Sequence, residues 1–495
     1  MHGATDVRID QGVFGDADLV AGHGPWPRLR VDEAGWSAAI GLLADGHAEL
    51  VSLWGDTPDI HMALRSSEQV VVLSLLARDG RYPSVGLHHP PAIRLERAVR
   101  DLFGLEPTGL PDTRPWLDHG RWHGDRPAAS DYPFLPAQGA VLHQIPVGPI
   151  HAGIIEPGHF RFTCNGETVV RLEERLGYVH KGIEGLIAGS DLARASRLAA
   201  RVSGDSTVAY GYAFARAIES ALGVEVPARA VWLRALMAEM ERIANHLGDV
   251  GGVCNDAAFS LALVHCAMLR ERLLRTAGTC FGHRLMMDKI VPGGTADLSQ
   301  SGIAAIRETV DAIGSALPRL LHLYDETPSL QDRTTGTGRV SVDLARQFAA
   351  GGYVGRASGR DFDARRDLCY APYDALPLAV ASQQNGDVDA RVRIRLDEIR
   401  YSLTMVNAIL ADLPDGPVLT PIPPADGEGL AIVEGFRGDV FVWLRIQDGV
   451  IRRCHLRDPS WFQWPLLEAA IDGNIVADFP LCNKSFNCSY SGHDL

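Results

Sequence analysis

The segment from residue 230 to residue 247, AVWLRALMAEMERIANHL, carries apolar side chains on almost every face of a helix. A helix of this kind is stable only when neighbouring elements cover it on all sides. The segment therefore predicts a helical bundle in which it takes an inner place. Apolar periodicity predicts six helices in this part of the chain, at about 203–222, 228–249, 257–282, 300–325, 340–350 and 389–412.

Residues 1–125 have a different pattern. Two runs rich in branched apolar residues, 48–54 and 70–77, are typical of strands. Apolar residues three and four apart over 92–104 predict an amphipathic helix that ends at Gly104. We expect a small α/β domain here.

Residues 126–145, rich in proline, aspartate and small residues, are interpreted as a linker to a second domain at 146–495. That domain begins with short strands around 148–180 and then becomes mainly helical. Strand patterns return near its end, at 429–434, 438–446 and 449–454. The expected fold class is α+β: a small α/β domain followed by a mainly helical domain with peripheral β-sheets.

A net charge of −14 argues against nucleic acid as a partner, because phosphate binding requires a basic surface. No run of about 18 apolar residues appears, which predicts no membrane span. The first residues lack the basic and apolar regions of a secretory signal. We therefore expect a cytoplasmic protein that reaches a membrane only through partner subunits.

The eight cysteines are scattered without a C-x2-C pair and are interpreted as reduced, mostly buried thiols. This spacing supports no iron–sulfur cluster within the chain. No G-x-G-x-x-G follows a predicted strand, so nucleotide binding by this chain is not expected. A lesser alternative is an unusual metal site formed by Cys482, Cys488 and His493.

Two short segments carry regularly spaced polar residues. In 201–210, Ser203, Ser206 and Tyr210 are three and seven residues apart, and on a helix they would share one face. Gly204 suits a tight entry into that helix.

The C-terminal segment 478–495 repeats this spacing, with Ser489 and Gly492 three residues apart and Cys488 one residue earlier. Together with 201–210, it has the frame of the two cysteine motifs that hold nickel and iron in nickel–iron hydrogenase large subunits.

The resemblance continues along most of the chain. Five further segments resemble the large subunits of complex I-related (group 4) hydrogenases of the formate hydrogenlyase and hydrogenase-4 type, and are similar to the 49-kDa subunit of NADH-quinone oxidoreductase: 148–161, 171–184, 291–294, 355–361 and 433–438. Residues 95–105 and 112–116 resemble the 30-kDa subunit of complex I, which is fused ahead of the large subunit in formate hydrogenlyase-type complexes.

In the hydrogenases, cysteines stand at the positions of Ser203, Ser206, Ser489 and Gly492. Thiolates bind soft transition metals because they ionise near neutral pH and are polarizable. Serine hydroxyls do this poorly, and glycine has no side chain. The resemblance therefore implies a hydrogenase-type fold without bound nickel, without hydrogenase activity and with no metal ligands of its own.

The resemblance also implies functional residues. Glu156 matches the glutamate that passes protons to and from the hydrogenase active site, and Arg437 matches the arginine that overhangs the metal. Both are expected to be catalytic. Complex I reduces quinone in the vacated metal cavity, and the residues expected to line that cavity here are Ser203, Ser206, Tyr210, Ser489 and His493.

The residues that contact quinone in complex I, a histidine and a tyrosine, are not kept. The histidine position falls on Ile155 or Glu156, and the tyrosine position falls on Ser203 or Gly204. The nearest replacements are Tyr210, His151 and His159.

Two functions follow from the resemblance. In the first, the chain is a subunit of a membrane-associated oxidoreductase. It takes electrons from an iron–sulfur partner resembling the 20-kDa subunit of complex I and passes them to a quinone-like acceptor. Proton-pump-like membrane subunits complete that complex, on the cytoplasmic side, and NAD binds elsewhere in it. In the second, the chain is a catalytically silent scaffold.

Five other polar residues in the matched segments are expected to satisfy one another in the interior rather than to act chemically. They are His180, Glu184, Glu239, Arg242 and His246.

Overall fold

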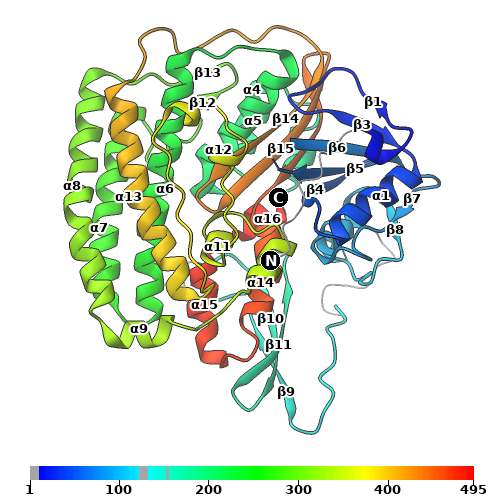
Figure 1. Ribbon diagram of the computed structural model, residues 1–495, viewed down its shortest axis with the longest axis horizontal. Coiled ribbons are helices and arrows are strands. Elements are labelled where there is room, and N and C mark those ends of the chain that lie inside the picture. The colour runs from blue at the N-terminus through cyan, green and yellow to red at the C-terminus, as the bar shows by residue number, and fades with distance from the viewer. Residues whose placement is uncertain (1–10, 68, 121, 123–131, 152–154) are drawn as a thin grey trace.

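The computed structural model describes residues 11–67, 69–120, 122, 132–151 and 155–495. Its helical body is a bundle of four long helices, on the left of Figure 1. They are α6 (Ala228–Asp256), α7 (Ser260–Phe281), α8 (Gln300–Asp325) and α13 (Val388–Ala411). Every residue of α6 from Leu233 to Leu247 is buried, which confirms the inner place predicted for this segment.

Shorter helices and a small hairpin complete this body. They are α3 (Ile183–Ile187), α4 (Leu192–Ala199), α5 (Thr207–Leu222), α9 (Pro328–Thr334), α10 (Val342–Gln347), α11 (Gly352–Ala357), α12 (Ala364–Asp367), α14 (Ser460–Ala470), α15 (Phe479–Phe486) and α16 (Tyr490–Asp494), with strands β12 (Ile290–Val291) and β13 (Gly294–Thr295).

The helix expected at 203–222 begins later than predicted. Its α-helical part starts at Thr207, after a single 3-10 turn, η4 (Gly204–Ser206). Ser203 has extended backbone angles, φ −140° and ψ 121°, and precedes that turn. Ser203 therefore does not share a helical face with Tyr210, contrary to the spacing argument.

The N-terminal part contains a five-stranded sheet of order β1-β3-β6-β5-β4. Its strands are β1 (Asp18–Leu19), β3 (Arg28–Val31), β4 (Glu49–Asp56), β5 (Asp59–Ser66) and β6 (Gln69–Leu76). Along β6, Val70 and Val72 enter one hydrophobic core while Val71 and Leu73 enter another. Because side chains alternate along a strand, the sheet is covered on both faces.

One of these cores lies between the sheet and its own helices, α1 (Glu33–Ala44) and α2 (Ile93–Phe103). Helix α2 ends at Gly104, which adopts φ 68°, so the predicted glycine stop is confirmed. A two-stranded ribbon, β7 (Arg81–Pro83) with β8 (Glu106–Thr108), lies beside them.

A second sheet joins the two parts of the chain. It has the order β16-β15-β14-β2, with β2 (His23–Gly24), β14 (Gly427–Gly435), β15 (Gly438–Gln447) and β16 (Val450–Arg457). Helix α5 covers one face closely, since a Cβ on Gly429 would lie 2.4 Å from the carbonyl oxygen of Ala217. On the other face Trp54 of β4 stacks on His455, with ring centroids 5.0 Å apart.

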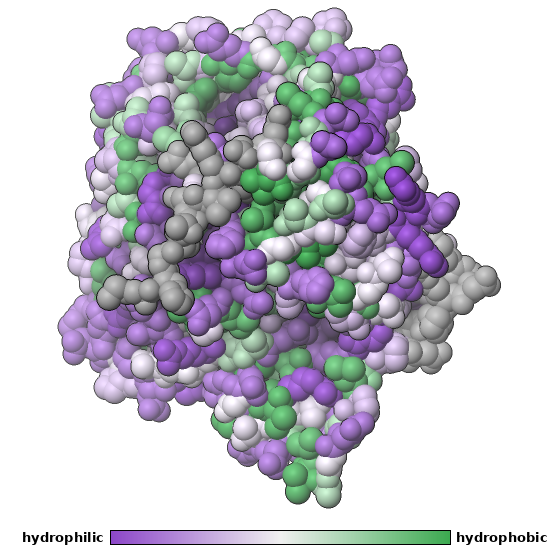
Figure 2. Space-filling model, turned by 45° about the vertical axis from the view of Figure 1, so that its right-hand side comes forward, coloured by the Kyte–Doolittle hydropathy of each residue, from purple (hydrophilic) through white to green (hydrophobic). Residues whose placement is uncertain are grey.

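The third sheet projects at the bottom of Figure 1 and consists of β9 (Leu142–Val147), β10 (His159–Asn165) and β11 (Thr168–Arg175). The last residues of the expected linker thus belong to β9, while 126–131 lies outside the described residues. Figure 2 shows apolar side chains exposed on this projection, and Val141 and Val170 are among the exposed apolar residues.

Within the ranges that the structure describes, no helix is long and apolar enough to cross a membrane.

Candidate functional site

A cavity of about 390 Å³ opens where η4, the β14–β15 turn, α15 and the start of α16 meet. Four of the seven predicted site residues line it: Glu156, Ser203, Arg437 and Ser489. The other three, Ser206, Tyr210 and His493, lie behind its walls.

An ion pair closes one side of this cavity. The guanidinium of Arg437 donates from both Nη atoms to Asp205, at 2.8 and 2.7 Å, and its Nε donates to the backbone oxygen of Asn487 at 2.6 Å. Arg437 Nη1 also lies 3.2 Å from Ser206 Oγ. Burial alone would raise the pKa of Asp205, but the charge and hydrogen bonds of Arg437 hold it at about 2. Both groups are therefore charged at neutral pH.

Hydrogen bonds between serines take the place of metal coordination. The hydroxyls of Ser203 and Ser489 are 3.0 Å apart, and Ser203 Oγ also donates to Asp205 Oδ1 at 2.7 Å. Ser489 Oγ accepts the backbone N–H of Gly492 at 2.8 Å, as the N-cap of α16. The two motifs thus meet as predicted, although 286 positions separate these serines in the chain.

The fourth ligand position is already filled. A Cβ on Gly492 would lie 2.4 Å from Oδ2 of Asp458, closer than real Cβ atoms come. Tyr210 donates to that same oxygen at 2.7 Å and is fully buried. Burial and the Asp458 carboxylate raise the pKa of Tyr210 well above its ordinary value. Tyr210 therefore holds Asp458 in place.

Glu156 lies at the cavity mouth. Its side chain is exposed, and Oε2 accepts the backbone N–H of Ser491 at 3.0 Å. A carboxylate placed between solvent and a cavity can exchange protons with both.

His493 occupies the junction with the N-terminal part. Its ring stacks on Trp461, with centroids 4.0 Å apart, and its Nε2 accepts the Trp116 indole N–H at 3.3 Å. Nδ1 lies 2.9 Å from Asp494 Oδ1. Asp494 in turn accepts backbone N–H groups of Gly177 and Val179. Residues 493 and 494 are fully buried, so neither an exposed tail nor a cavity-lining role describes them.

Four acidic or basic residues of the site were not singled out from the sequence. Asp205 lies inside the first motif, so its carboxylate beside Gly204 was the available signal. Nothing in the sequence pattern linked the others to the site. The four residues are Asp205, Asp256, Asp458 and Lys484.

The donor atoms present do not suit nickel. Hydroxyls stand at three of the four hydrogenase ligand positions, and the Asp458 carboxylate fills the space beside the fourth. Burial raises the pKa of Cys482 to about 11 and that of Cys488 well above its ordinary value, so both remain thiols. Among the described residues, no three of His, Cys, Asp and Glu are grouped to hold a metal ion.

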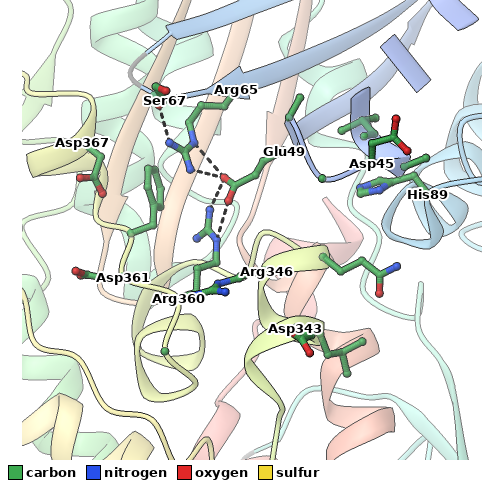
Figure 3. A pocket seen from close by; sticks show the side chains of 18 of the residues that line it. Asp45, Glu49, Arg65, Ser67, His89, Asp343, Arg346, Arg360, Asp361 and Asp367 are labelled. Atoms are coloured by element: carbon green, nitrogen blue, oxygen red, sulfur yellow. Dashed lines mark hydrogen bonds and ion pairs between the residues drawn. The ribbon is translucent and has the colours of Figure 1, made fainter. Parts of the chain in front are cut away.

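A larger groove of about 1150 Å³ lies where the N-terminal part meets α10 and the 359–367 segment (Figure 3). Its charged side chains mostly pair with one another. Glu49 accepts hydrogen bonds from Arg65 and from Arg360, and Arg366 pairs with Asp361 at 3.1 Å. These ion pairs connect the two parts of the chain.

Two of the residues expected to be structural do connect elements. Glu184 accepts from Arg453 and from His455, both at 2.8 Å, and so attaches α3 to β16. His180 Nδ1 lies 2.7 Å from the backbone oxygen of Asp494 and holds the end of α16.

Fold and cavity together define a hydrogenase large-subunit type of protein whose metal-binding motifs have become a hydrogen-bonded polar site. Comparison with known families agrees. Residues 256–423 match the family of the 49-kDa subunit of respiratory-chain NADH dehydrogenase, and residues 30–138 match that of its 30-kDa subunit.

Formate hydrogenlyase subunit 5 of Escherichia coli is 32% identical over 84% of this chain and 78% of its own length. Hydrogenase-4 component G of the same organism is 31% identical over 86% and 78%. A subunit of the NADH-quinone oxidoreductase of Dehalococcoides mccartyi is 29% identical over 67% and 92%. Among solved structures, the archaeal membrane-bound sulfane sulfur reductase superposes with a TM-score of 0.68 and 25% identity over 71% of this chain and 98% of the other.

The chain therefore belongs to the family of formate hydrogenlyase subunit 5 and hydrogenase-4 component G, with fused regions like the 30-kDa and 49-kDa subunits of complex I. These relatives are subunits of oxidoreductase complexes.

Proposed function

We propose that this chain is the cavity-bearing subunit of a membrane-associated oxidoreductase, and that a quinone-like acceptor is reduced in the 390 Å³ cavity. The observation that carries the proposal is the cavity itself. A scaffold has no need for open space at the old metal site, whereas this space is large enough to admit the head of a small ligand. The buried Arg437–Asp205 pair gives it a polar wall.

Reduction of a quinone to a quinol consumes two electrons and two protons. The chain holds no cysteine set for a cluster, so the electrons come from an iron–sulfur partner resembling the 20-kDa subunit of complex I. Glu156 brings protons from solvent to the mouth of the cavity. Arg437, fixed by Asp205, presents positive charge toward the reduced acceptor and stabilises it. Membrane subunits of the proton-pump type anchor the complex on the cytoplasmic side.

The first test is acceptor reduction by the intact complex purified through this chain. We expect inhibitor-sensitive reduction of a quinone analogue. An organic polysulfide is a second acceptor in the same assay, because the structural relative is named a sulfane sulfur reductase. Reduction of the polysulfide alone would change the acceptor in this proposal. Reduction of neither compound would favour the scaffold.

Metal analysis of the same preparation should find no stoichiometric nickel, because hydroxyls and a glycine stand at the ligand positions. About one nickel per chain would contradict the proposed function.

Replacing Glu156 by glutamine should slow turnover of the assembled complex by about 100-fold, the low end of what a placed acid–base group contributes. Assembly should be unaffected, since the amide oxygen can still accept the Ser491 N–H. Glu167→Gln, on the exposed β10–β11 turn, is the matched control and should keep full activity. Equal rates for the two variants would remove Glu156 from proton transfer.

A further inference from the structure

Eight side chains form a buried ionic network behind the cavity wall that carries Arg437. They come from α6, α11, α13, β14 and the segment that enters α12, and none is more than 3% exposed. The members are Glu239, Arg242, His246, Arg356, Asp363, Arg365, Glu398 and Glu434.

Arg356 lies at the centre of the network. Its Nη2 donates to Glu398 at 2.6 Å and its Nη1 donates to Glu434 at 2.9 Å. The same Nη1 is 3.3 Å from a carboxylate oxygen of Asp363. One guanidinium therefore compensates three carboxyl groups.

The other cations complete the network from either side. Arg365 donates to Asp363 at 2.6 Å and to Glu239 at 2.9 Å. Arg242 lies 3.4 Å from Glu239 and 3.5 Å from Glu398. His246 Nε2 lies 2.7 Å from Glu398.

The charges of these groups do not balance. Four carboxylates and three guanidiniums sum to −1 when the imidazole is neutral (−4 + 3 = −1). An uncompensated charge in the interior costs several kcal/mol, and a buried group takes up a proton rather than bear that cost. Within the network one proton removes the imbalance, whether it resides on a carboxyl group or on His246.

We infer that this network stores one exchangeable proton in the folded chain and supplies it to the Arg437 side of the cavity. The stored proton is a property of the network alone, whereas its delivery rests on the proposed function. Because the groups interact strongly, the proton belongs to the network as a whole rather than to one residue.

The electrostatics of Glu434 agree with this inference. Burial raises the pKa of Glu434 to about 7, Asp363 and Asp439 raise it further, and Arg356 and Arg242 oppose them. Asp439 itself pairs with Arg457.

Burial lowers the pKa of His246 despite the hydrogen bond to Glu398, and Arg242 and Arg395 act in the same direction as burial. Glu434 and His246 together are thus the groups over which the proton is shared.

The network directly adjoins the cavity wall. Arg242 donates to the backbone oxygens of Gly435 and Glu434, at 3.0 and 2.9 Å, and so supports the turn that leads to Arg437. The His246 ring meets Phe436 edge-on at 6.1 Å. In the part of the chain that the structure describes, no residue forms a hydrogen bond with the buried Nδ1 of His246. The proton store therefore lies one side chain away from the Arg437–Asp205 pair.

The stored proton has a definite effect on stability. A carboxyl whose pKa rises on folding stabilises the fold fully below its unfolded pKa, and that contribution disappears as pH rises through the folded value. For Glu434 this window runs from about pH 4.5 to about pH 7. Wild type should lose stability across the window relative to Glu434→Gln.

Infrared titration of the full-length chain tests the store directly. Glu434→Gln should remove one protonated-carboxyl band that titrates near pH 7. Asp363→Asn should shift the same band to lower pH although Glu434 is still present, because it removes the excess negative charge while asparagine can keep the cap on Arg365 N–H. Glu96→Gln is the matched control, since Glu96 has a pKa raised to about 7 by burial in the N-terminal part. It should remove a different band.

An unchanged band in Asp363→Asn would overturn the network store and leave burial of Glu434 as its cause. Loss of no band in Glu434→Gln would overturn it as well. If a variant does not fold, wild type with carbon-13-labelled glutamate decides, because absence of any labelled carboxyl that titrates near pH 7 contradicts the store.

Delivery is measured in the assembled complex. Glu434→Gln should slow acceptor reduction by at least about tenfold and flatten its dependence on pH near 7, whereas Glu96→Gln should not. Equal rates and pH profiles for the two variants would overturn delivery. A positive infrared result with no acceptor reduced by wild type would leave the store standing and remove only the proposed function.

Discussion

Replacing Arg356 by methionine should lower the free energy of unfolding by about 3–5 kcal/mol, the usual cost of removing one partner from a buried ion pair. Arg356 is fully buried and faces Glu398, Glu434 and Asp363. Methionine fills much of the space but leaves these carboxyl groups with too little positive charge. Urea-induced unfolding at neutral pH measures the loss.

The cost should also depend on pH. Orphaned carboxylates take up protons as pH falls, so the difference from wild type should be smaller near pH 5 than near pH 8. A difference that does not change with pH would mean that lost packing, rather than charge, produces the effect.

Arg366→Met is the matched control. Arg366 lies close by in sequence, pairs with Asp361 and Asp367, and is 40% exposed. Solvent screens such pairs, so the loss should be below about 1 kcal/mol. Similar losses at both positions would contradict the account of the buried network.

Restoring a cysteine at Gly492 should destabilise the chain by more than about 2 kcal/mol, because the new Cβ overlaps the Asp458 carboxylate. That carboxylate cannot easily move, since Tyr210 donates to one of its oxygens and the Ser460 N–H to the other. Thermal unfolding of the purified chain measures the effect.

The same substitution at Gly204 provides the control. Nothing lies within 4 Å of a Cβ built on Gly204, which lines the cavity. Gly204→Cys should change stability by less than about 1 kcal/mol and should react readily with a thiol reagent. If Gly492→Cys were equally stable and equally reactive, the fourth ligand position would be open rather than filled.

Much of the helical part follows from the sequence, because its signals are local. The all-round apolar pattern of 230–247 predicted an inner helix, and α6 is that helix. Helix α13 was expected at 389–412 and spans Val388–Ala411. The strand expected at 438–446 is β15, Gly438–Gln447. In each case the period of apolar residues carries the information.

The helix boundary at 203–222 shows where local signals fail. The spacing of Ser203, Ser206 and Tyr210 suited one helical face, yet the backbone at Ser203 is extended. Ser203 binds Asp205 and Ser489, and Arg437 contacts Asp205 and Ser206 from another sheet. A distant guanidinium therefore takes part in fixing the first turn, and no local pattern encodes that contact.

The sequence by itself determined which elements form and that the metal ligands are gone, since both are properties of residue type and short-range spacing. Only the tertiary structure decided how the old metal site is filled. Asp458 lies beside Gly492, His493 is held between Trp461 and Trp116, and β2 joins the sheet of β14. These contacts join residues tens to hundreds of positions apart, and the excess carboxylate behind Arg437 appears only when such contacts are counted together. Charge balance and steric fit depend on spatial neighbours, which the order of residues alone does not specify.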